Sequence, residues 1–384
     1  MSIALGLLAV TAWLYLLLGR GGFWLASERD VEPPPGAAPG RCPSVVAVVP
    51  ARNEADVIET AIGGLLGQSY AGGLRVVVVD DASADETGAL ARAAAERLGA
   101  GERLTVIEGR PLPAGWTGKL WAVSQGVEAA SASAPEYLWL TDADIAHQPG
   151  VLGGLVSRAE DGRLALVSRM ARLQTGAWPE KLLIPAFVFF FDMLFPFAWV
   201  NEPGRRIAAA AGGCMLVRRD ALVASGGIAA IRGEIIDDCA LAARLKAQGP
   251  IRLELTRSST SLRPYRSLGE IGRMVSRSAY AQLRYSPWLL AGTVLGMALI
   301  YVAPAALAAV GSGPARWLGV AAWALMAIAY QPMLRYFRLS ALWGLALPLI
   351  GVLYTVFTLQ SAIQVWRGKG GMWKGRAQAL ATQA

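Results

Sequence analysis

Residues 74–86 (LRVVVVDDASADE) decide the fold. The first six form a β-branched run typical of a buried strand, and the polar second half is typical of a loop that leads into a helix. Similar apolar runs lie at 44–49 (SVVAVV), 104–108 (LTVIE) and 137–140 (YLWL), most of them followed by a loop and an alanine-rich helical segment. This alternation predicts parallel α/β layers with a Rossmann-like half.

Ligands of an open parallel sheet bind beyond the carboxyl ends of its strands. The residues just after the predicted strands are polar and acidic: 50–54 (PARNE), 80–85 (DDASAD) and 141–144 (TDAD). No Gly-x-Gly-x-x-Gly follows the first predicted strand, and the sequence has no Gly-Lys-Ser/Thr loop. The sequence therefore disfavours a nicotinamide-dependent dehydrogenase and a P-loop nucleotidase.

Asp142 and Asp144 are candidate metal ligands. Two acids one residue apart after a buried strand can offer oxygen ligands to Mg²⁺ or Mn²⁺, which bind through one or two carboxylates together with substrate phosphates. The alternative is an ordinary turn in which Asp144 caps a helix. His147 is the one histidine of the sequence, and it is either a metal ligand, a group behind the ligands, or a plain surface or loop residue.

Asp80 and Asp81 also have a structural alternative. Ser83 and Glu86 have the spacing of a capping box that starts the next helix. A capping box does not explain two adjacent acids at the tip of an apolar strand, because their burial costs free energy unless a ligand or hydrogen bonds compensate for it.

The composition indicates a membrane protein with one soluble domain. Of the 384 residues, 54% are hydrophobic and 17% are charged, against roughly 25% charged in an ordinary soluble domain. Uncharged runs at 2–19, 286–315, 317–334 and 339–366 are each long enough to cross the hydrocarbon core of a bilayer. The three cysteines are isolated, which disfavours a disulfide scaffold or a structural zinc site and is compatible with a reducing cytosol.

The net charge of +8 belongs to the membrane-flanking segments, because seven Lys or Arg and no Asp or Glu follow Tyr285. A nucleic-acid partner is therefore disfavoured. Arg20 follows the first apolar run and no basic residue precedes it, which predicts an uncleaved anchor and a cytoplasmic domain after it. If all three later runs crossed the membrane, the basic tail would lie on the non-cytoplasmic side, against the positive-inside rule. Either one of the later runs does not cross completely, with the run that contains Pro348 as the first candidate, or the first run does not span the membrane.

These patterns divide the chain into five expected segments: an N-terminal membrane anchor at 1–25, a linker at 26–42, a soluble domain at 43–285, a transmembrane region at 286–366 and a basic tail at 367–384. Within the domain, the Phe-rich stretch 182–200 is either a buried core segment or an interfacial element. The second alternative rests on its aromatic residues and prolines, which suit the depth of the lipid head groups.

The motifs VVPARNE, VVVVDDASADET, GKLWAVSQG, LTDAD, GGCMLVRR and IIDDCALAARL follow one another in an order that resembles the family 2 inverting glycosyltransferases with the GT-A fold. Such enzymes take a sugar from a nucleotide-sugar donor. The fuller strings GWTGKLWAVSQG, LTDADIAHQP, IPAFVFFFDMLFPFAWVNEP, AAAAGGCMLVRRDAL and SLRPY, with the flanking apolar runs, resemble the hopanoid-biosynthesis-associated glycosyltransferases. The resemblance implies an α/β GT-A nucleotide-sugar-binding domain at 43–285, with an N-terminal anchor and C-terminal transmembrane helices.

The resemblance also implies roles for single residues. Those expected to hold the nucleobase and ribose are Pro50, Ala51, Arg52, Glu54, Asp80 and Asp81. Lys119 is expected near the diphosphate, and Asp142 and Asp144 are expected to hold a divalent cation, Mg²⁺ or Mn²⁺. The expected catalytic base is Asp238, and the residues expected on the acceptor side are Gly213, Cys214, Asp237 and Arg277. From the residues alone, Gly213 also fits an ordinary turn and Cys214 a small buried side chain.

Processive synthases of this family carry Gln-x-x-Arg-Trp after the base, whereas this chain has VSRSAYAQL at 275–283, with Arg277 but no following Trp. A single transfer is therefore preferred. We expect a multi-pass enzyme of the inner (cytoplasmic) membrane, with its catalytic domain facing the cytoplasm, that moves one sugar to a lipid acceptor such as a hopanoid. The alternatives are a polyprenyl-phosphate glycosyltransferase, a processive polysaccharide synthase and a non-enzymatic membrane scaffold.

Overall fold

The computed structural model describes residues 2–30, 41–368, 372–373 and 376–377, and it contains two compact units. The helical unit comprises residues 2–27, 175–199 and 264–368, and the α/β unit comprises residues 28–30, 41–174 and 200–263. The proline-rich part of the predicted linker and most of the predicted basic tail lie outside the described residues.

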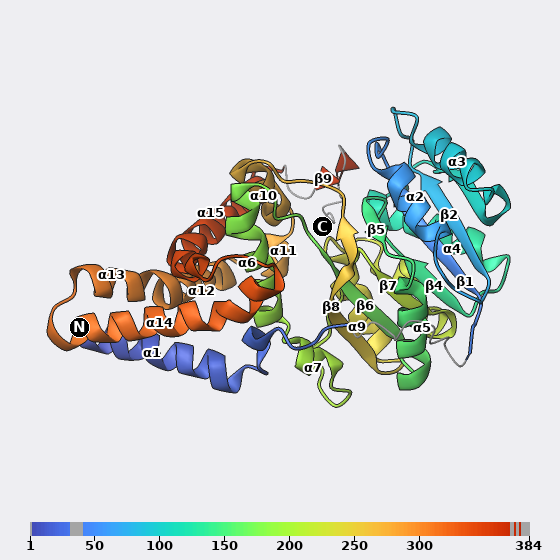
Figure 1. Ribbon diagram of the computed structural model, residues 1–384. Coiled ribbons are helices and arrows are strands. Elements are labelled where there is room, and N and C mark those ends of the chain that lie inside the picture. The colour runs from blue at the N-terminus through green and yellow to red at the C-terminus, as the bar shows by residue number, and fades with distance from the viewer. Residues whose placement is uncertain (1, 31–40, 369–371, 374–375, 378–384) are drawn as a thin grey trace. The chain divides into compact units, whose positions relative to one another are not determined.

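An eight-stranded sheet forms the centre of the α/β unit, in the order β3-β2-β1-β4-β7-β6-β8-β5 (Figure 1). The strands are β1 (Val45–Ala51), β2 (Leu74–Asp80), β3 (Leu104–Glu108), β4 (Tyr137–Leu140), β5 (Ile145–His147), β6 (Leu166–Arg172), β7 (Met215–Arg218) and β8 (Ile251–Ser261). The four strands predicted from the sequence are confirmed.

The first half of the sheet is parallel and Rossmann-like, as predicted. β1 runs parallel to both β2 and β4, and β2 runs parallel to β3. Every residue of β1 is buried, which explains its continuous apolar run. β7 runs antiparallel to β4 and to β6, which begins a mixed second half. The strand order reverses at β1, so the carboxyl ends of β1 and β4 form the switch point where such sheets bind ligands.

Six α-helices lie wholly within the described α/β unit: α2 (Ile58–Leu66), α3 (Thr87–Arg97), α4 (Gly118–Ser131), α5 (Val151–Gly162), α8 (Arg219–Ala224) and α9 (Asp237–Lys246). The hydroxyl of Thr117 caps α4 by accepting the N–H of Leu120 at 3.3 Å. Later in the same helix, Gly126 lies directly against Val48 and Val79 of the sheet. A residue without a side chain at this point lets α4 approach the sheet closely.

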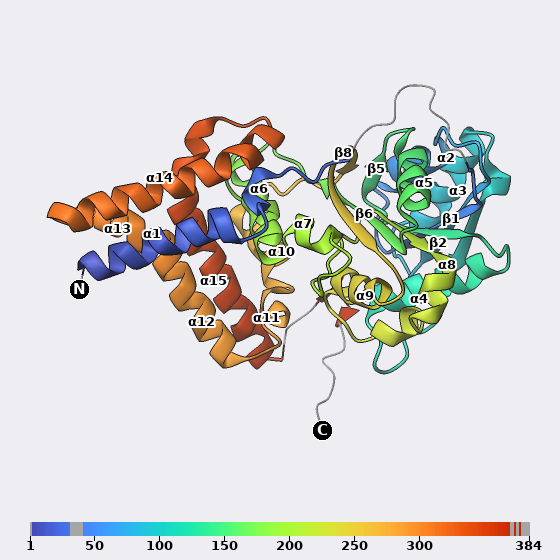
Figure 2. The ribbon, with the colours of Figure 1, turned by 90° about the horizontal axis from the view of Figure 1, so that it is seen from below.

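Four segments of the helical unit are long and apolar enough to cross a membrane: α1 (Ser2–Gly19), α12 to α13 (Pro287–Val310), α14 (Gly313–Tyr336) and η5 with α15 (Ala341–Trp366). They coincide with the four apolar runs of the sequence. α1 lies along α14, with Gly6 against Leu318 (Figure 2). In the most apolar part of these segments, between 22% and 39% of the residues are buried, and the others are half-buried or exposed.

Phe189 and Phe190 belong to the core of the helical unit. They lie in α6 (Trp178–Leu194), and both are buried. The ring of Phe189 packs edge-on against Tyr330 with 5.1 Å between ring centroids, and that of Phe190 packs against Tyr354 at 4.8 Å. Of the two alternatives for the Phe-rich stretch, the buried core segment therefore applies to these two side chains, because neither is free to insert into head groups.

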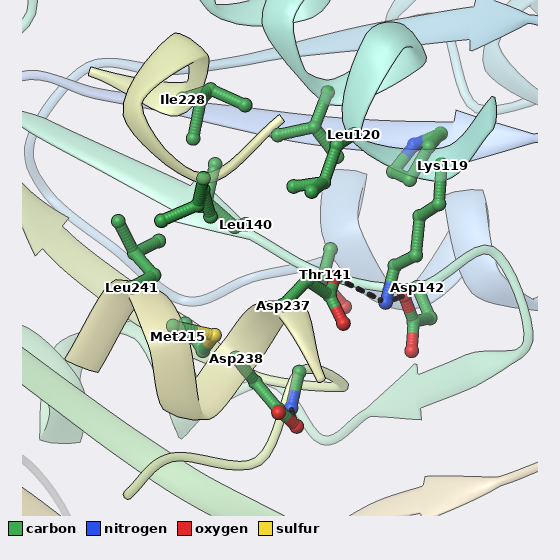
Figure 3. A pocket seen from close by; sticks show the side chains of 14 residues that line it. Lys119, Leu120, Leu140, Thr141, Asp142, Met215, Ile228, Asp237, Asp238 and Leu241 are labelled. Carbon is green, nitrogen blue, oxygen red and sulfur yellow. Dashed lines mark hydrogen bonds and ion pairs between the residues drawn. The ribbon is translucent and has the colours of Figure 1, made fainter. Parts of the chain in front are cut away.

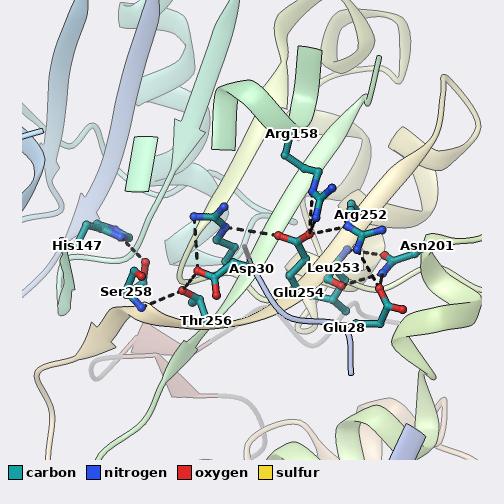
Figure 4. Close-up of polar contacts among 12 residues, drawn as sticks. Glu28, Asp30, His147, Arg158, Asn201, Arg252, Leu253, Glu254, Thr256 and Ser258 are labelled. Carbon is teal, nitrogen blue, oxygen red and sulfur yellow. Dashed lines mark hydrogen bonds and ion pairs between the residues drawn. The ribbon is translucent and has the colours of Figure 1, made fainter. Parts of the chain in front are cut away.

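Residues 28–30, which the sequence places in a linker, extend the edge of β8. The N–H of Leu255 donates to the carbonyl of Glu28 at 2.8 Å, and the N–H of Asp30 donates to the carbonyl of Leu255 at 2.9 Å. Side chains add an ion network (Figure 4): Arg252 lies 3.1 Å from Glu28 and 2.6 Å from the buried Glu254. The start of the predicted linker is therefore fixed to the sheet.

Gly126→Ala is expected to destabilise the α/β unit, with Gly63→Ala as the matched control. Both glycines lie inside helices, but a Cβ at Gly126 would collide with Val48, whereas nothing lies within 4 Å of one at Gly63. We expect Gly126→Ala to lower the free energy of unfolding by roughly 1–3 kcal/mol, and Gly63→Ala to raise it by up to about 1 kcal/mol. Denaturant titration in detergent measures both, and equal effects would contradict the close approach of α4.

Candidate active site

Hydrogen bonds join the loops that follow β1 and β2. The N–H of Asn53 donates to Oγ of Ser83 at 3.0 Å, and the N–H of Glu54 donates to Oγ1 of Thr87 at 2.9 Å. The predicted capping box of Ser83 and Glu86 does not form, because α3 begins at Thr87 and Glu86 takes up a left-handed conformation with a φ of 49°. Ser83 binds the neighbouring loop instead of starting a helix.

Arg52, Asp80 and Asp81 lie at this junction of two loops. Asp81 is fully buried, its N–H donates to the carbonyl of Ala51 at 2.8 Å, and Arg52 lies 3.8 Å from its carboxylate. Asp80 is half-buried and accepts the N–H of Ser83 at 2.9 Å. Burial of Asp81 thus holds the loop in shape, while Asp80 and Arg52 remain partly accessible from outside.

Lys119 stands at the centre of an acidic cluster (Figure 3). Its Nζ lies 2.9 Å from Oδ1 of Asp142 and 3.2 Å from Oδ2 of Asp237. Lys119 comes from the first turn of α4, Asp142 follows β4, and Asp237 begins α9. Burial alone would lower the pKa of Lys119, but the carboxylates of Asp142 and Asp237 hold this pKa above its ordinary value. The side chain is therefore a cation at neutral pH.

Asp238 faces the same cluster from the first turn of α9. Its Oδ2 accepts the N–H of Gly212 at 3.0 Å, and its Oδ1 accepts the N–H of Cys239 at 2.7 Å. Burial and the negative charge of Asp237 raise the pKa of Asp238 to about 6, against the opposite effect of Lys119. Such a carboxyl group is ionised at neutral pH and is still basic enough to accept a proton, as a general base must be.

Arg263 is a residue of this region that sequence reasoning misses. Its Nε lies 3.2 Å from Oδ2 of Asp144, and its Nη2 forms an ion pair with Glu54. The N–H of Leu262 donates to the carbonyl of Asp144 at 2.7 Å, which holds the end of β8 beside the loop of the acid pair. The only sequence signal is the string SLRPY, which carries the family resemblance but no assigned role.

A small cavity of about 30 Å³ adjoins the cluster, and most of its lining is apolar. Its polar residues include Lys119, Asp142, Asp237 and Asp238. Within the described part of the chain, no three His, Cys, Asp or Glu side chains are grouped as a complete metal site. Asp142 and Asp144 carry carboxylates of the kind that bind Mg²⁺ or Mn²⁺ together with phosphates and water. Only Asp142 lines this cavity, and the two carboxylates pair with Lys119 and Arg263, respectively.

Three of the residues expected on the acceptor side do not line this cavity. Cys214 is fully buried in the core of the α/β unit, and burial raises the pKa of its thiol, so it is an inert packing residue. The carbonyl of Gly213 accepts the hydroxyl of Thr141 at 2.8 Å, and the lining glycine is Gly212. Arg277 follows α10 in the helical unit and is exposed. The fourth expected residue, Asp237, does line the cavity.

His147 is neither a surface residue nor available to a metal. It lies in β5 and is 5% exposed, with its ring 4.6 Å from that of Trp139. Its Nε2 is 2.9 Å from Oγ1 of Thr141, and its Nδ1 is 2.8 Å from Oγ of Ser259. Burial lowers the pKa of His147 to about 3, so the ring is neutral and both of its nitrogens already have partners.

The sequence and the structure of the chain were compared with those of known proteins. The sequence profile described as "Glycosyl transferase family 2" matches residues 46–225, which include Lys119, Asp142 and Asp144 but not Asp238. No curated protein matches the chain.

Among solved structures, a mannosyltransferase from Pyrobaculum calidifontis in complex with GDP-Man and Mn²⁺ has 23% identity and a TM-score of 0.57, over 94% of this chain and 99% of that chain. Glucosyl-3-phosphoglycerate synthase from Mycobacterium tuberculosis has 18% identity and a TM-score of 0.43, over 67% and 87%. Residues 46–225 thus match a glycosyl transferase family 2 domain, and the likeness to the mannosyltransferase supports a mixed α/β, Rossmann-like GT-A fold.

Proposed function

We propose that this chain is a metal-dependent, inverting glycosyltransferase that moves a single sugar from a nucleotide-sugar donor to a lipid acceptor. The observation that carries the proposal is the cluster of Lys119, Asp142, Asp237 and Asp238 beyond the carboxyl end of β4. It combines a fixed cation, a metal-binding carboxylate and a carboxyl group with a raised pKa. Transfer of a sugar from a diphosphate with inversion needs these three functions.

The donor would lie along the switch point of the sheet. Pro50, Ala51, Arg52, Glu54 and Asp80 would receive the nucleobase and ribose, with the buried Asp81 holding their loop in place. Lys119 would lie near the diphosphate, and Asp142 and Asp144 would hold the divalent cation. When bound, this cation supplies positive charge that stabilises the departing diphosphate. Carboxylate oxygens are suitable ligands for both Mg²⁺ and Mn²⁺, so the two residues would hold either ion.

Asp238 would act as the base in a single displacement. It takes the proton of the acceptor hydroxyl while the hydroxyl oxygen forms a bond to the anomeric carbon and the bond from this carbon to the diphosphate breaks. Attack from the side opposite to the diphosphate inverts the anomeric centre. Gly212 fixes the carboxylate through its N–H, and Lys119 offsets part of the negative charge that gathers around the leaving group.

The lipid acceptor is supported by the helical unit. Four apolar segments long enough to cross a bilayer suit a multi-pass protein of the inner (cytoplasmic) membrane. Arg20 directly after α1 favours a cytoplasmic α/β unit. Within this class we propose a hopanoid acceptor, because the strings GWTGKLWAVSQG and SLRPY resemble the hopanoid-associated enzymes. The missing Trp after Arg277 supports transfer of one sugar rather than polymerisation.

Membranes that contain the chain should convert labelled nucleotide-sugars into a labelled lipid. We expect incubation with UDP-sugars and GDP-sugars, followed by organic extraction and mass spectrometry, to show one added sugar per lipid molecule. Membranes with the Asp238→Asn variant are the matched blank. Label that stays in the aqueous phase would contradict the lipid acceptor, and a ladder of products would contradict single transfer.

Removal of the divalent cation should abolish turnover with the donor identified in that assay. Asp142→Ala and Asp144→Ala should each lose most of the donor affinity that Mn²⁺ adds, because cation and diphosphate bind together. Calorimetric titration of the donor with and without Mn²⁺ measures this difference. Glu102→Ala removes an exposed carboxylate of the same unit and is the control. Full activity of Asp142→Ala in EDTA would show that the acid pair holds no catalytic metal.

Asp238→Asn should lower kcat by about 100-fold or more with little change in donor Kd, because the amide keeps the shape but cannot accept a proton. In the unchanged enzyme, kcat/KM should fall as the pH drops through about 6, where Asp238 becomes protonated.

Asp237→Asn is the matched control for this experiment. It should keep most turnover and move the inflection to lower pH, because the charge of Asp237 raises the pKa of Asp238. A larger loss of kcat for Asp237→Asn than for Asp238→Asn would assign the base to Asp237 instead.

A further inference from the structure

A second cavity, of about 600 Å³, lies within the helical unit between α10 (Leu268–Ser276) and α15 (Leu347–Trp366). Part of its lining is apolar and comes from Leu268, Leu353, Phe357 and Ile363. The other part is polar and comes from Arg273, Gln360, Gln364 and Arg367. None of these residues has a role in the proposed transfer reaction, so the cavity needs its own explanation.

Local contacts fix both walls of this cavity. Ser267 caps α10 by accepting the N–H of Glu270 at 3.2 Å, and Oε2 of Glu270 accepts the N–H of Arg266 at 2.6 Å. Gly272 lies so close to the ring of Phe357 that a Cβ there would be 2.8 Å from it. α10 is therefore packed directly against α15 beside the cavity.

The cavity carries an unbalanced positive charge. Its described lining includes the guanidinium groups of Arg273 and Arg367 and has no Asp or Glu. Glu270 is the acid of α10, but its carboxylate is turned back to the start of its own helix, where it accepts the N–H of Arg266. Two guanidinium groups with the side-chain amides of Gln360 and Gln364 are donors suited to a phosphate.

The end of α15, beside this polar part, has the residue pattern of a membrane–water interface. Trp366 is the last residue of α15, is 62% exposed, and is directly followed by Arg367. An exposed Trp next to a basic residue at the end of an apolar helix is typical of the membrane–water interface. Leu353 and Phe357 of the apolar part lie earlier in the same helix than Gln364 and Arg367, so one ligand with a charged head and an apolar tail matches both parts.

We propose that this cavity binds one anionic phospholipid of the bilayer, with its phosphate on Arg273 and Arg367 and an acyl chain against Phe357 and Leu353. Basic pockets between membrane helices bind anionic head groups in this way. The proposal rests on the membrane location in the proposed function but not on the transfer chemistry. A soluble phosphate compound would use the two arginines alone and would leave the apolar lining without a partner.

The test measures lipid binding to the full chain, purified in detergent, by native mass spectrometry. The chain should bind phosphatidylglycerol in preference to phosphatidylcholine of the same acyl chains. Arg273→Gln and Arg367→Gln should each weaken the binding of phosphatidylglycerol about fivefold, and the double variant should weaken it roughly thirtyfold. The double change to lysine should keep most of the affinity, because lysine also binds phosphate as a point charge.

Arg316→Gln is the matched control, since Arg316 is an exposed arginine of the helical unit outside the cavity. Equal losses for Arg316→Gln and for the cavity variants would mean diffuse surface attraction and would overturn the proposal. Equal binding of both lipids, or displacement of phosphatidylglycerol by excess glycerol phosphate, would overturn it as well. Sugar transfer is assayed in the same preparations: selective lipid binding without transfer contradicts only the proposed function, and transfer without lipid selectivity contradicts only this inference.

Discussion

The ion pairs of Lys119 are the interaction on which the site depends. Asp142, Asp237 and Asp238 come from two separate parts of the chain and gather in one partly buried place, where their charges repel one another. The ammonium of Lys119 offsets this repulsion because it lies within 3.2 Å of two of them. Without this cation the carboxylates would remain close together in a poorly solvated site, at a cost that unpaired buried charges make large.

The same arrangement sets the acid–base properties of Asp238. Burial and Asp237 raise its pKa, whereas Lys119 and the N–H groups of Gly212 and Cys239 lower it, and the balance lies near 6. A base needs both ionisation at the working pH and affinity for a proton, and a value just below neutrality provides both. In the proposed reaction, the position of Lys119 would link the binding of a diphosphate to the strength of the base, since one charge would act on both.

The parts of the fold that follow from local sequence could be predicted, and those set by distant partners could not. β1 to β4 are apolar runs with polar ends, so their location and the acids beyond them can be read from the sequence. Ser83 does not cap a helix, because its hydroxyl oxygen accepts the N–H of Asn53 instead. His147 is buried because its short strand pairs with residues 259–261, more than one hundred positions later, and Arg263 reaches the site through the same pairing.

β8 connects the stability of the sheet to the site. Near its start, the fully buried Glu254 is paired with Arg158 at 3.0 Å and Arg252 at 2.6 Å. A buried carboxylate without these partners would be costly. Glu254 also lies 3.6 Å from Arg169, its register partner in β6, so this network favours the observed pairing of β8 with β6. The pairing of β8 also decides which residue after the end of β8 lies next to Asp144. Arg263 follows the end of this strand and lies 3.2 Å from Asp144, so the charges around Glu254 support the strand that carries Arg263 although none of them belongs to the site.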